Sequence, residues 1–141
     1  MVNKAQVGVL ALQGDFAEHI EMLSNFDVDV HKIKNKSQLE KLDGLIIPGG
    51  ESTTIKKLID RYDFENAIKE KINHGMSLWG TCAGLICIAN KLTEKDPIPM
   101  GIIDVEVSRN WFGRQVDSFE TNIEFKGITE NIKAVFIRAP I

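Results

Sequence analysis

The stretch Ser77-Leu78-Trp79-Gly80-Thr81-Cys82-Ala83-Gly84 decides the fold, because it joins a short predicted strand to a predicted helix over residues 85–91. The turn between them has the form G-x-C-x-G, the thiol version of a nucleophile elbow, which exposes one side chain at the carboxyl end of a parallel sheet. The dipole of the following helix favours a thiolate at Cys82. The pattern predicts a reactive cysteine; a buried structural cysteine in a glycine turn is the alternative.

The segments around this stretch alternate between strand and helix over the first two-thirds of the chain. Apolar runs and amphipathic spacing predict strands over residues 7–12, 28–33, 45–47 and 77–79, and helices over residues 16–23, 52–59, 63–74 and 85–91. After Pro97 and Pro99, strands are predicted over residues 102–107, 119–125 and 134–137. We therefore expect an α/β fold with a doubly wound, mostly parallel, flavodoxin-like sheet, helices on both faces, and strand-rich additions in the last third.

Composition excludes several classes of protein. With 141 residues, 43% of them hydrophobic and 26% charged, the chain is expected to form one ordered domain. A net charge of −3 without a basic stripe argues against nucleic-acid binding, and no apolar run approaches the ~20 residues of a membrane span. Cys82 and Cys87 suit neither a disulfide nor a metal site, which favours the cytoplasm. Nucleotide phosphate loops and the H-E-x-x-H motif are absent, so no cofactor or metal is predicted.

A second candidate site is the stretch Pro48-Gly49-Gly50-Glu51-Ser52-Thr53, which follows a predicted strand. Loops at the carboxyl edge of a parallel sheet converge on its binding crevice. The two glycines leave backbone N–H groups accessible, as an oxyanion hole for acyl transfer requires. The alternative is a tight turn in which Ser52 or Thr53 caps the next helix.

Further candidates lie later in the chain. The loop Arg109-Asn110-Trp111-Phe112-Gly113-Arg114-Gln115 could clamp a carboxylate-bearing substrate or dock a partner, unless it is a solvated hairpin. The strand ending in Phe136-Ile137-Arg138 delivers another arginine. Cys87 is predicted to lie in the core. The histidines sit in no ligand pattern, and His19 is expected to be a surface residue rather than a base.

Taken together, these residues resemble the glutaminase subunits of pyridoxal 5'-phosphate synthase, a family of triad-type class I glutamine amidotransferases. The resemblance runs from Val7 to Pro140. It rests on the stretches Leu12-Gln13-Gly14, Leu45 to Thr54, Gly80 to Ile86, Arg109 to Glu120 and Phe136 to Pro140. The second and fourth of these are much more particular to this family than a cysteine elbow alone.

The resemblance implies that glutamine is hydrolysed to glutamate and ammonia through a cysteine thioester. The ammonia would pass to a (β/α)₈-barrel synthase partner that makes pyridoxal 5'-phosphate, vitamin B6. By position, Cys82 would be the nucleophile, and the N–H groups of Gly50 and Ala83 would form the oxyanion hole. Glutamine would be held by Gly50, Glu51, Ser52, Arg109, Ile137 and Arg138. Gln13 would lie near the synthase contact.

One departure from the family pattern concerns the general base. The triad of the family ends in a His-Pro-Glu element, but no histidine here follows His74, and the sequence reaches Ile141 just after Arg-Ala-Pro. Residues 1–141 are therefore expected to form a single glutamine amidotransferase domain that lacks the family's C-terminal segment and is impaired in turnover. The alternatives are a non-catalytic module that binds glutamine or the synthase, and a stress-type cysteine hydrolase of the same fold.

Overall fold

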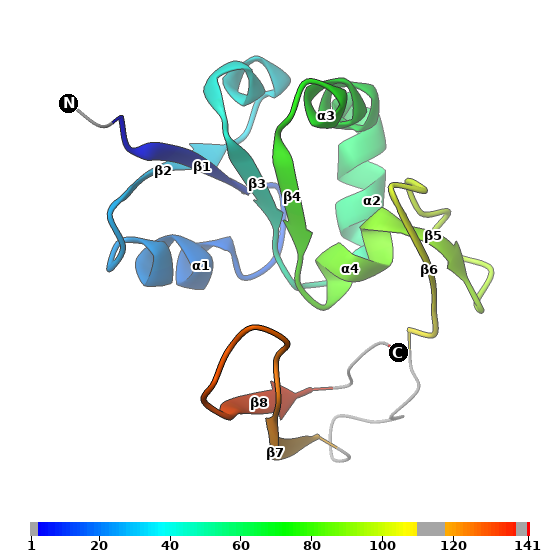
Figure 1. Ribbon diagram of the computed structural model, residues 1–141. Helices are drawn as coiled ribbons and strands as arrows, with labels where there is room; N and C mark the ends of the chain where they lie inside the picture. Colours follow the sequence, from blue (N-terminus) through cyan, green and yellow to red (C-terminus); the bar gives the residue numbers. More distant parts are fainter. Residues whose placement is uncertain (1–2, 110–117, 138–140) are drawn as a thin grey trace.

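Four parallel strands, in the order β2-β1-β3-β4, form the central sheet of the computed structural model, which describes residues 3–109, 118–137 and 141 (Figure 1). The strands are β1 (Ala5–Leu10), β2 (Val28–Ile33), β3 (Gly44–Ile47) and β4 (Ser77–Gly80). Val9 in β1 lies opposite Lys32 on one side and Ile46 on the other. The predicted parallel sheet is confirmed, with β1 beginning two residues earlier than the apolar run suggests.

The order of the strands creates a crevice at one edge of the sheet. From β1 the chain crosses to β2 on one side, and it then returns to build β3 and β4 on the other side. The loops that follow β1 and β3 therefore leave the sheet in opposite directions. In doubly wound sheets this switch point, at the carboxyl ends of the strands, is where ligands bind.

Helices flank both faces of the sheet. Helix α1 (Phe16–Leu23) contacts β1 and β2, whereas η1 (Lys36–Lys41), α2 (Ser52–Arg61) and α3 (Phe64–Asn73) follow the other crossovers (Figure 1). Helix α1 has no fully buried residue, while α2 and α3 place Ile55, Ile59, Phe64 and Ile68 in the main core. The sheet is therefore packed much more firmly on the α2–α3 side.

A buried lysine joins α2 to α3. The side chain of Lys56 is 8% exposed, and its Nζ pairs with Asp60 at 2.5 Å and with Glu65 at 2.9 Å. Burial opposes the charge, but the hydrogen bonds and the attraction of both carboxylates outweigh it and raise the pKa of Lys56. The charge of this buried side chain is thus tolerated because it is paired with two carboxylates, one of them largely exposed.

The last third of the chain is rich in strands, with one correction to the predicted elements. Helix α4 (Ala83–Ile88) ends three residues earlier than expected, and β5 (Ala89–Leu92) follows it directly. β5 pairs in parallel with β6 (Ile103–Val107), beginning with Ala89 opposite Ile103. The apolar run after Gly84 suits helix and strand equally, and the pairing with β6 determines where the helix stops.

A hairpin lies below α1 and α4 in Figure 1, and the end of its second strand lines the cavity described below. Strands β7 (Phe119–Ile123) and β8 (Ile132–Phe136) pair antiparallel, with the rings of Phe119 and Phe136 stacked 4.9 Å apart. Both strands are close to the predicted positions. Among residues 3–109 and 118–137, no helix combines the length and the apolar content that crossing a lipid bilayer requires.

Candidate active site

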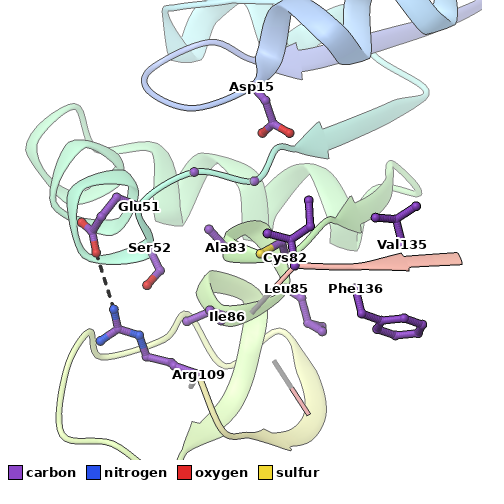
Figure 2. A pocket seen from close by; sticks show the side chains of 13 residues that line it. Asp15, Glu51, Ser52, Cys82, Ala83, Leu85, Ile86, Arg109, Val135 and Phe136 are labelled. Atoms are coloured by element: carbon purple, nitrogen blue, oxygen red, sulfur yellow. Dashed lines mark hydrogen bonds and ion pairs between the residues drawn. The ribbon is translucent and has the colours of Figure 1, made fainter. Parts of the chain in front are cut away.

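A cavity of about 660 Å³ opens at the carboxyl edge of the sheet (Figure 2). The loop after β1 contributes Asp15, and the end of β8 contributes Phe136 and the following Ile137. The candidate site residues that line it are Gly50, Glu51, Ser52, Cys82, Ala83, Arg109 and Ile137. Arg138 and the loop residues 110–117 lie outside the described residues. Segments that are far apart in the sequence therefore meet around one cavity.

Cys82 occupies a backbone conformation that is unusual for a residue with a side chain. Its φ is +48° and its ψ is −106°, a combination that costs about 1–3 kcal/mol unless the surroundings impose it. The surroundings do so here: the Thr81 N–H donates to the Ile47 carbonyl at 3.1 Å, and the Gly84 N–H donates to the Thr81 carbonyl at 2.8 Å. The sharp turn keeps Cys82 exposed at the cavity rather than buried in the core.

The two glycines that flank the turn are required by close backbone approach. A Cβ on Gly84 would lie 2.0 Å from the carbonyl oxygen of Ile47 in β3, and a Cβ on Gly80 would lie 2.5 Å from the carbonyl carbon of Gly84. Only residues without a side chain let α4 start this close to the sheet. The G-x-C-x-G spacing thus has a steric cause.

The second cysteine is a core residue, as predicted. Cys87 is fully buried in α4, where its Sγ lies 3.6 Å from the Ser52 carbonyl oxygen that it donates to. Burial raises the pKa of the Cys87 thiol to about 12. Because the thiolate is the reactive form, Cys87 is chemically inert near neutral pH.

We expect iodoacetamide at pH 7.5 to alkylate Cys82 and to leave Cys87 unmodified, because one thiol is exposed and the other is buried with a pKa of about 12. Peptide mass spectrometry after a short exposure measures both sites. Protein unfolded in guanidinium serves as the control and should be labelled at both cysteines. Equal labelling of the two cysteines in the folded protein would contradict this assignment.

The glycine loop after β3 is held by the loop after β1. The Asp15 N–H donates to the Gly49 carbonyl at 3.1 Å, so the Gly50 N–H, on the opposite side of the same planar peptide, points away from Asp15. The Glu51 N–H donates to Gln13 Oε1 at 3.0 Å. Gly50 has a φ of +150°, and a Cβ there would lie 2.6 Å from Gln13 Oε1. The loop is thereby fixed, with Gly50 exposed in the lining of the cavity.

Glu51, rather than Ser52 or Thr53, caps helix α2. Its carboxylate accepts hydrogen bonds from the backbone N–H groups of Thr53 at 3.2 Å and Thr54 at 2.7 Å, and from the Thr54 hydroxyl. Burial opposes ionisation, but these hydrogen bonds outweigh it and lower the pKa of Glu51. The alternative in which Ser52 or Thr53 caps the helix does not hold, because a longer carboxylate one residue earlier reaches the same donors.

Arg109 is anchored at the edge of the cavity by contacts that the sequence does not reveal. Its backbone N–H donates to the Glu94 carboxylate at 2.9 and 3.1 Å, and its Nη1 donates to the Asp96 carbonyl. The dashed line in Figure 2 marks the contact of 3.5 Å between its Nη2 and Glu51 Oε1. The Arg109 side chain is only 21% exposed. A guanidinium and a carboxylate thus lie side by side at one end of the cavity.

His19 differs from its predicted place on the surface. It is half-buried on α1, and its Nε2 lies 3.0 Å from the Thr81 hydroxyl, next to Cys82. Asp15 lines the cavity, and Glu94 and His19 contact Arg109 and Thr81; the sequence alone assigned none of the three to the site. Of these, Asp15 had a usable signal, because it follows Gln13-Gly14 at the end of the first strand. The described residues contain no group of three or more His, Cys, Asp or Glu side chains that could hold a metal ion.

Comparisons with known proteins point to one family. Residues 9–141 match the SNO glutamine amidotransferase family. The chain is 52% identical over 136 residues to "Pyridoxal 5'-phosphate synthase subunit PdxT" of Niallia circulans, covering 96% of the chain and 72% of that protein. It is 48% identical over 136 residues to the protein of the same name from Shouchella clausii, covering 96% and 70%.

Solved structures also match this chain. A crystal structure of a glutamine amidotransferase matches with a TM-score of 0.88 and 44% identity, covering 96% of the chain and 72% of that structure. A peptidase E protein from Listeria monocytogenes matches with a TM-score of 0.63 at 13% identity, which shows a shared fold alone. The predicted α/β architecture is confirmed by the first of these structures.

Proposed function

Because the chain belongs to the SNO glutamine amidotransferase family, we propose that it is the glutaminase subunit of a pyridoxal 5'-phosphate synthase. In this role it hydrolyses glutamine to glutamate and ammonia. The observation that supports the chemistry most directly is the strained, exposed Cys82 in the same cavity as the glycine loop and Arg109. A nucleophile, backbone donors and a carboxylate-binding cation are the groups that amide hydrolysis of an amino acid requires.

The proposed reaction has two stages at Cys82. The Sγ thiolate attacks the side-chain amide carbon of glutamine, and the negative charge that develops on the carbonyl oxygen is stabilised by the N–H groups of Gly50 and Ala83. The C–N bond then breaks, and the nitrogen leaves as ammonia after it takes up the proton that the thiol lost when the thiolate formed. Water attacks the resulting thioester and releases glutamate, which returns the thiol to its starting state.

Arg109 and Glu51 are proposed to recognise the amino-acid end of the substrate. The Arg109 guanidinium would bind the α-carboxylate of glutamine, because its planar donors match a carboxylate. The adjacent Glu51 carboxylate provides the opposite charge that an α-ammonium group needs, and Ser52 and Ile137 also line the cavity. Arg138 is proposed as a further contact from the resemblance alone.

Replacing Arg109 with alanine is expected to raise KM for glutamine by about 10- to 100-fold, with a smaller effect on kcat, because a charge-assisted hydrogen bond contributes ~1.5–3 kcal/mol. Steady-state ammonia release at varied glutamine concentration measures KM and kcat separately. Arg61→Ala is the matched control, because Arg61 is an exposed arginine at the far end of α2. An unchanged KM in the Arg109 variant would remove Arg109 from the binding site.

The partner is proposed to be a (β/α)₈-barrel synthase subunit that consumes the ammonia, and Gln13 is proposed to lie near that contact. The relatives named above support this assignment, since their names describe a synthase subunit. The decisive test is ammonia release from glutamine by the protein mixed with the synthase subunit, with asparagine as the control substrate. Saturable glutamine binding without release would favour a non-catalytic module instead. The cytoplasmic location stays a prediction.

A further inference from the structure

We propose that His19 is a positioning residue that aligns Cys82 with the Gly50 N–H by linking the two loops that present them. The inference rests on the proposed function. His19 lies on α1, outside the cavity, and 62 residues separate it from Thr81 in the sequence. Its Nε2 is 3.0 Å from the Thr81 Oγ1, and its Nδ1 is 3.2 Å from the Asp15 carbonyl oxygen.

The partners of the ring determine which atoms donate. A carbonyl oxygen accepts only, so Nδ1 holds the proton and donates to Asp15. In the neutral imidazole, Nε2 then accepts from the Thr81 hydroxyl. The ring therefore acts as a rigid bridge between the start of α1 and the residue immediately before Cys82.

The bridge continues to the glycine loop. The same Asp15 that receives the His19 bond donates its backbone N–H to the Gly49 carbonyl, 3.1 Å away. That bond orients the peptide whose other end is the Gly50 N–H. One connected path thus runs from Thr81 through His19 and Asp15 to Gly49. Thr81 directly precedes Cys82, the proposed nucleophile, and Gly49 directly precedes Gly50, whose N–H is the proposed oxyanion donor.

Such a link matters because packing alone holds neither α1 nor the turn at Cys82. Helix α1 has no fully buried residue, so apolar contacts fix it weakly to the sheet. Cys82 keeps its unusual φ of +48° only while its neighbours are restrained. The backbone of Thr81 is bonded to β3 and α4, and the bond from its side chain to His19 adds restraint from α1. Small misplacements of reacting groups can lower rates strongly.

The test uses a double-mutant cycle with His19→Ala, Thr81→Val and the combination. The protein, with its synthase subunit, is treated with the glutamine analogue 6-diazo-5-oxo-L-norleucine, and labelling of Cys82 is followed by mass spectrometry. Labelling reports attack by Sγ without the later hydrolysis step. We expect each single variant to react about five- to tenfold more slowly than wild type, and the double variant to react no more slowly than the slower single variant.

The chain offers a matched control and a conservative variant. His74 makes the same bond to the carbonyl four residues earlier but lies at the opposite edge of the sheet, before β4 begins, so His74→Ala should react like wild type. His19→Gln keeps an acceptor near the position of Nε2, and its backbone N–H can still donate to the Asp15 carbonyl as in wild type, at 3.4 Å, so this variant should restore part of the rate. The shorter His19→Asn cannot reach Thr81 and should not. If His19→Ala fails to fold, the difference in rate between His19→Gln and His19→Asn still tests the positioning role of His19.

The outcomes separate the two proposals. If wild-type Cys82 is not labelled by the analogue, both the proposed function and the positioning role are overturned. If wild type is labelled but His19→Ala reacts within twofold of it, only the positioning role is overturned. The same holds if the effects of the His19 and Thr81 substitutions are additive, or if His19→Gln and His19→Asn react equally. Alkylation by iodoacetamide, which needs no alignment, should change less than twofold in the His19 variants.

Discussion

Replacing Cys82 with alanine is expected to abolish glutamine hydrolysis, leaving at most the residual rate that substrate binding and the backbone donors supply. The structure gives the reason: Cys82 is the exposed thiol of the cavity, on a turn whose strained φ of +48° directs it away from the core. Without Sγ no thioester forms, and the backbone donors have no covalent intermediate to stabilise. Ammonia release in the presence of the synthase subunit measures the loss, and mass spectrometry with the glutamine analogue should show no label.

Cys87→Ala is the matched control for this prediction. It removes the other thiol from the same helix region, but Cys87 is fully buried and its pKa is raised to about 12 by burial. We expect the control to retain ammonia release and labelling, with only a modest loss of stability from the small cavity. Undiminished turnover in Cys82→Ala would overturn its assignment as nucleophile. Loss of activity in both variants would indicate a structural effect instead.

Replacing Gly84 with alanine is expected to lower the free energy of unfolding by about 3 kcal/mol or more. The added Cβ would lie 2.0 Å from the carbonyl oxygen of Ile47. That oxygen belongs to the backbone of a central strand, and it also accepts the Thr81 N–H, so it cannot move without disturbing the turn. Urea denaturation followed by circular dichroism measures the change, and reactivity of Cys82 should fall with it.

Gly44→Ala provides a matched glycine on the same strand as Ile47. A Cβ at Gly44 would meet its nearest neighbour, the Ser77 carbonyl oxygen, at 3.8 Å, which is an ordinary contact. We expect its free energy of unfolding to change by less than about 0.5 kcal/mol. Equal losses in the two variants would show that the cost comes from glycine replacement in general and not from the close approach of α4 to β3.

Most of the fold was predictable because its signals are local. The apolar runs of β1 and β3 indicate strands buried on both faces, and each is followed by a turn that contains glycine. The boundary between α4 and β5 was not predictable. Residues 85–91 are compatible with either structure, and hydrogen bonds from β6, which is remote in the sequence, determine that the helix ends at Ile88.

The candidate site was also predictable only where its signals are local. The G-x-C-x-G spacing and the glycine pair after β3 could be recognised from the sequence, because each depends on residues that are close together in the chain. The anchoring of Arg109 by Glu94 and the His19–Thr81 bond could not be recognised, because each joins groups from separate parts of the chain, 15 and 62 residues apart. The Glu51 cap is local, but the sequence offered Ser52 and Thr53 as caps for the same helix.

The sequence by itself thus determined the α/β class, the family resemblance and the identity of the cysteine at the turn. These depend on periodicity, turn chemistry and steric tolerance, which act over a few residues. Only the tertiary structure decided which side chains surround Cys82 and how the two loops are tied together. That arrangement follows from the strand order β2-β1-β3-β4, which brings the ends of β1 and β3 side by side, because parallel neighbours finish at the same edge of a sheet.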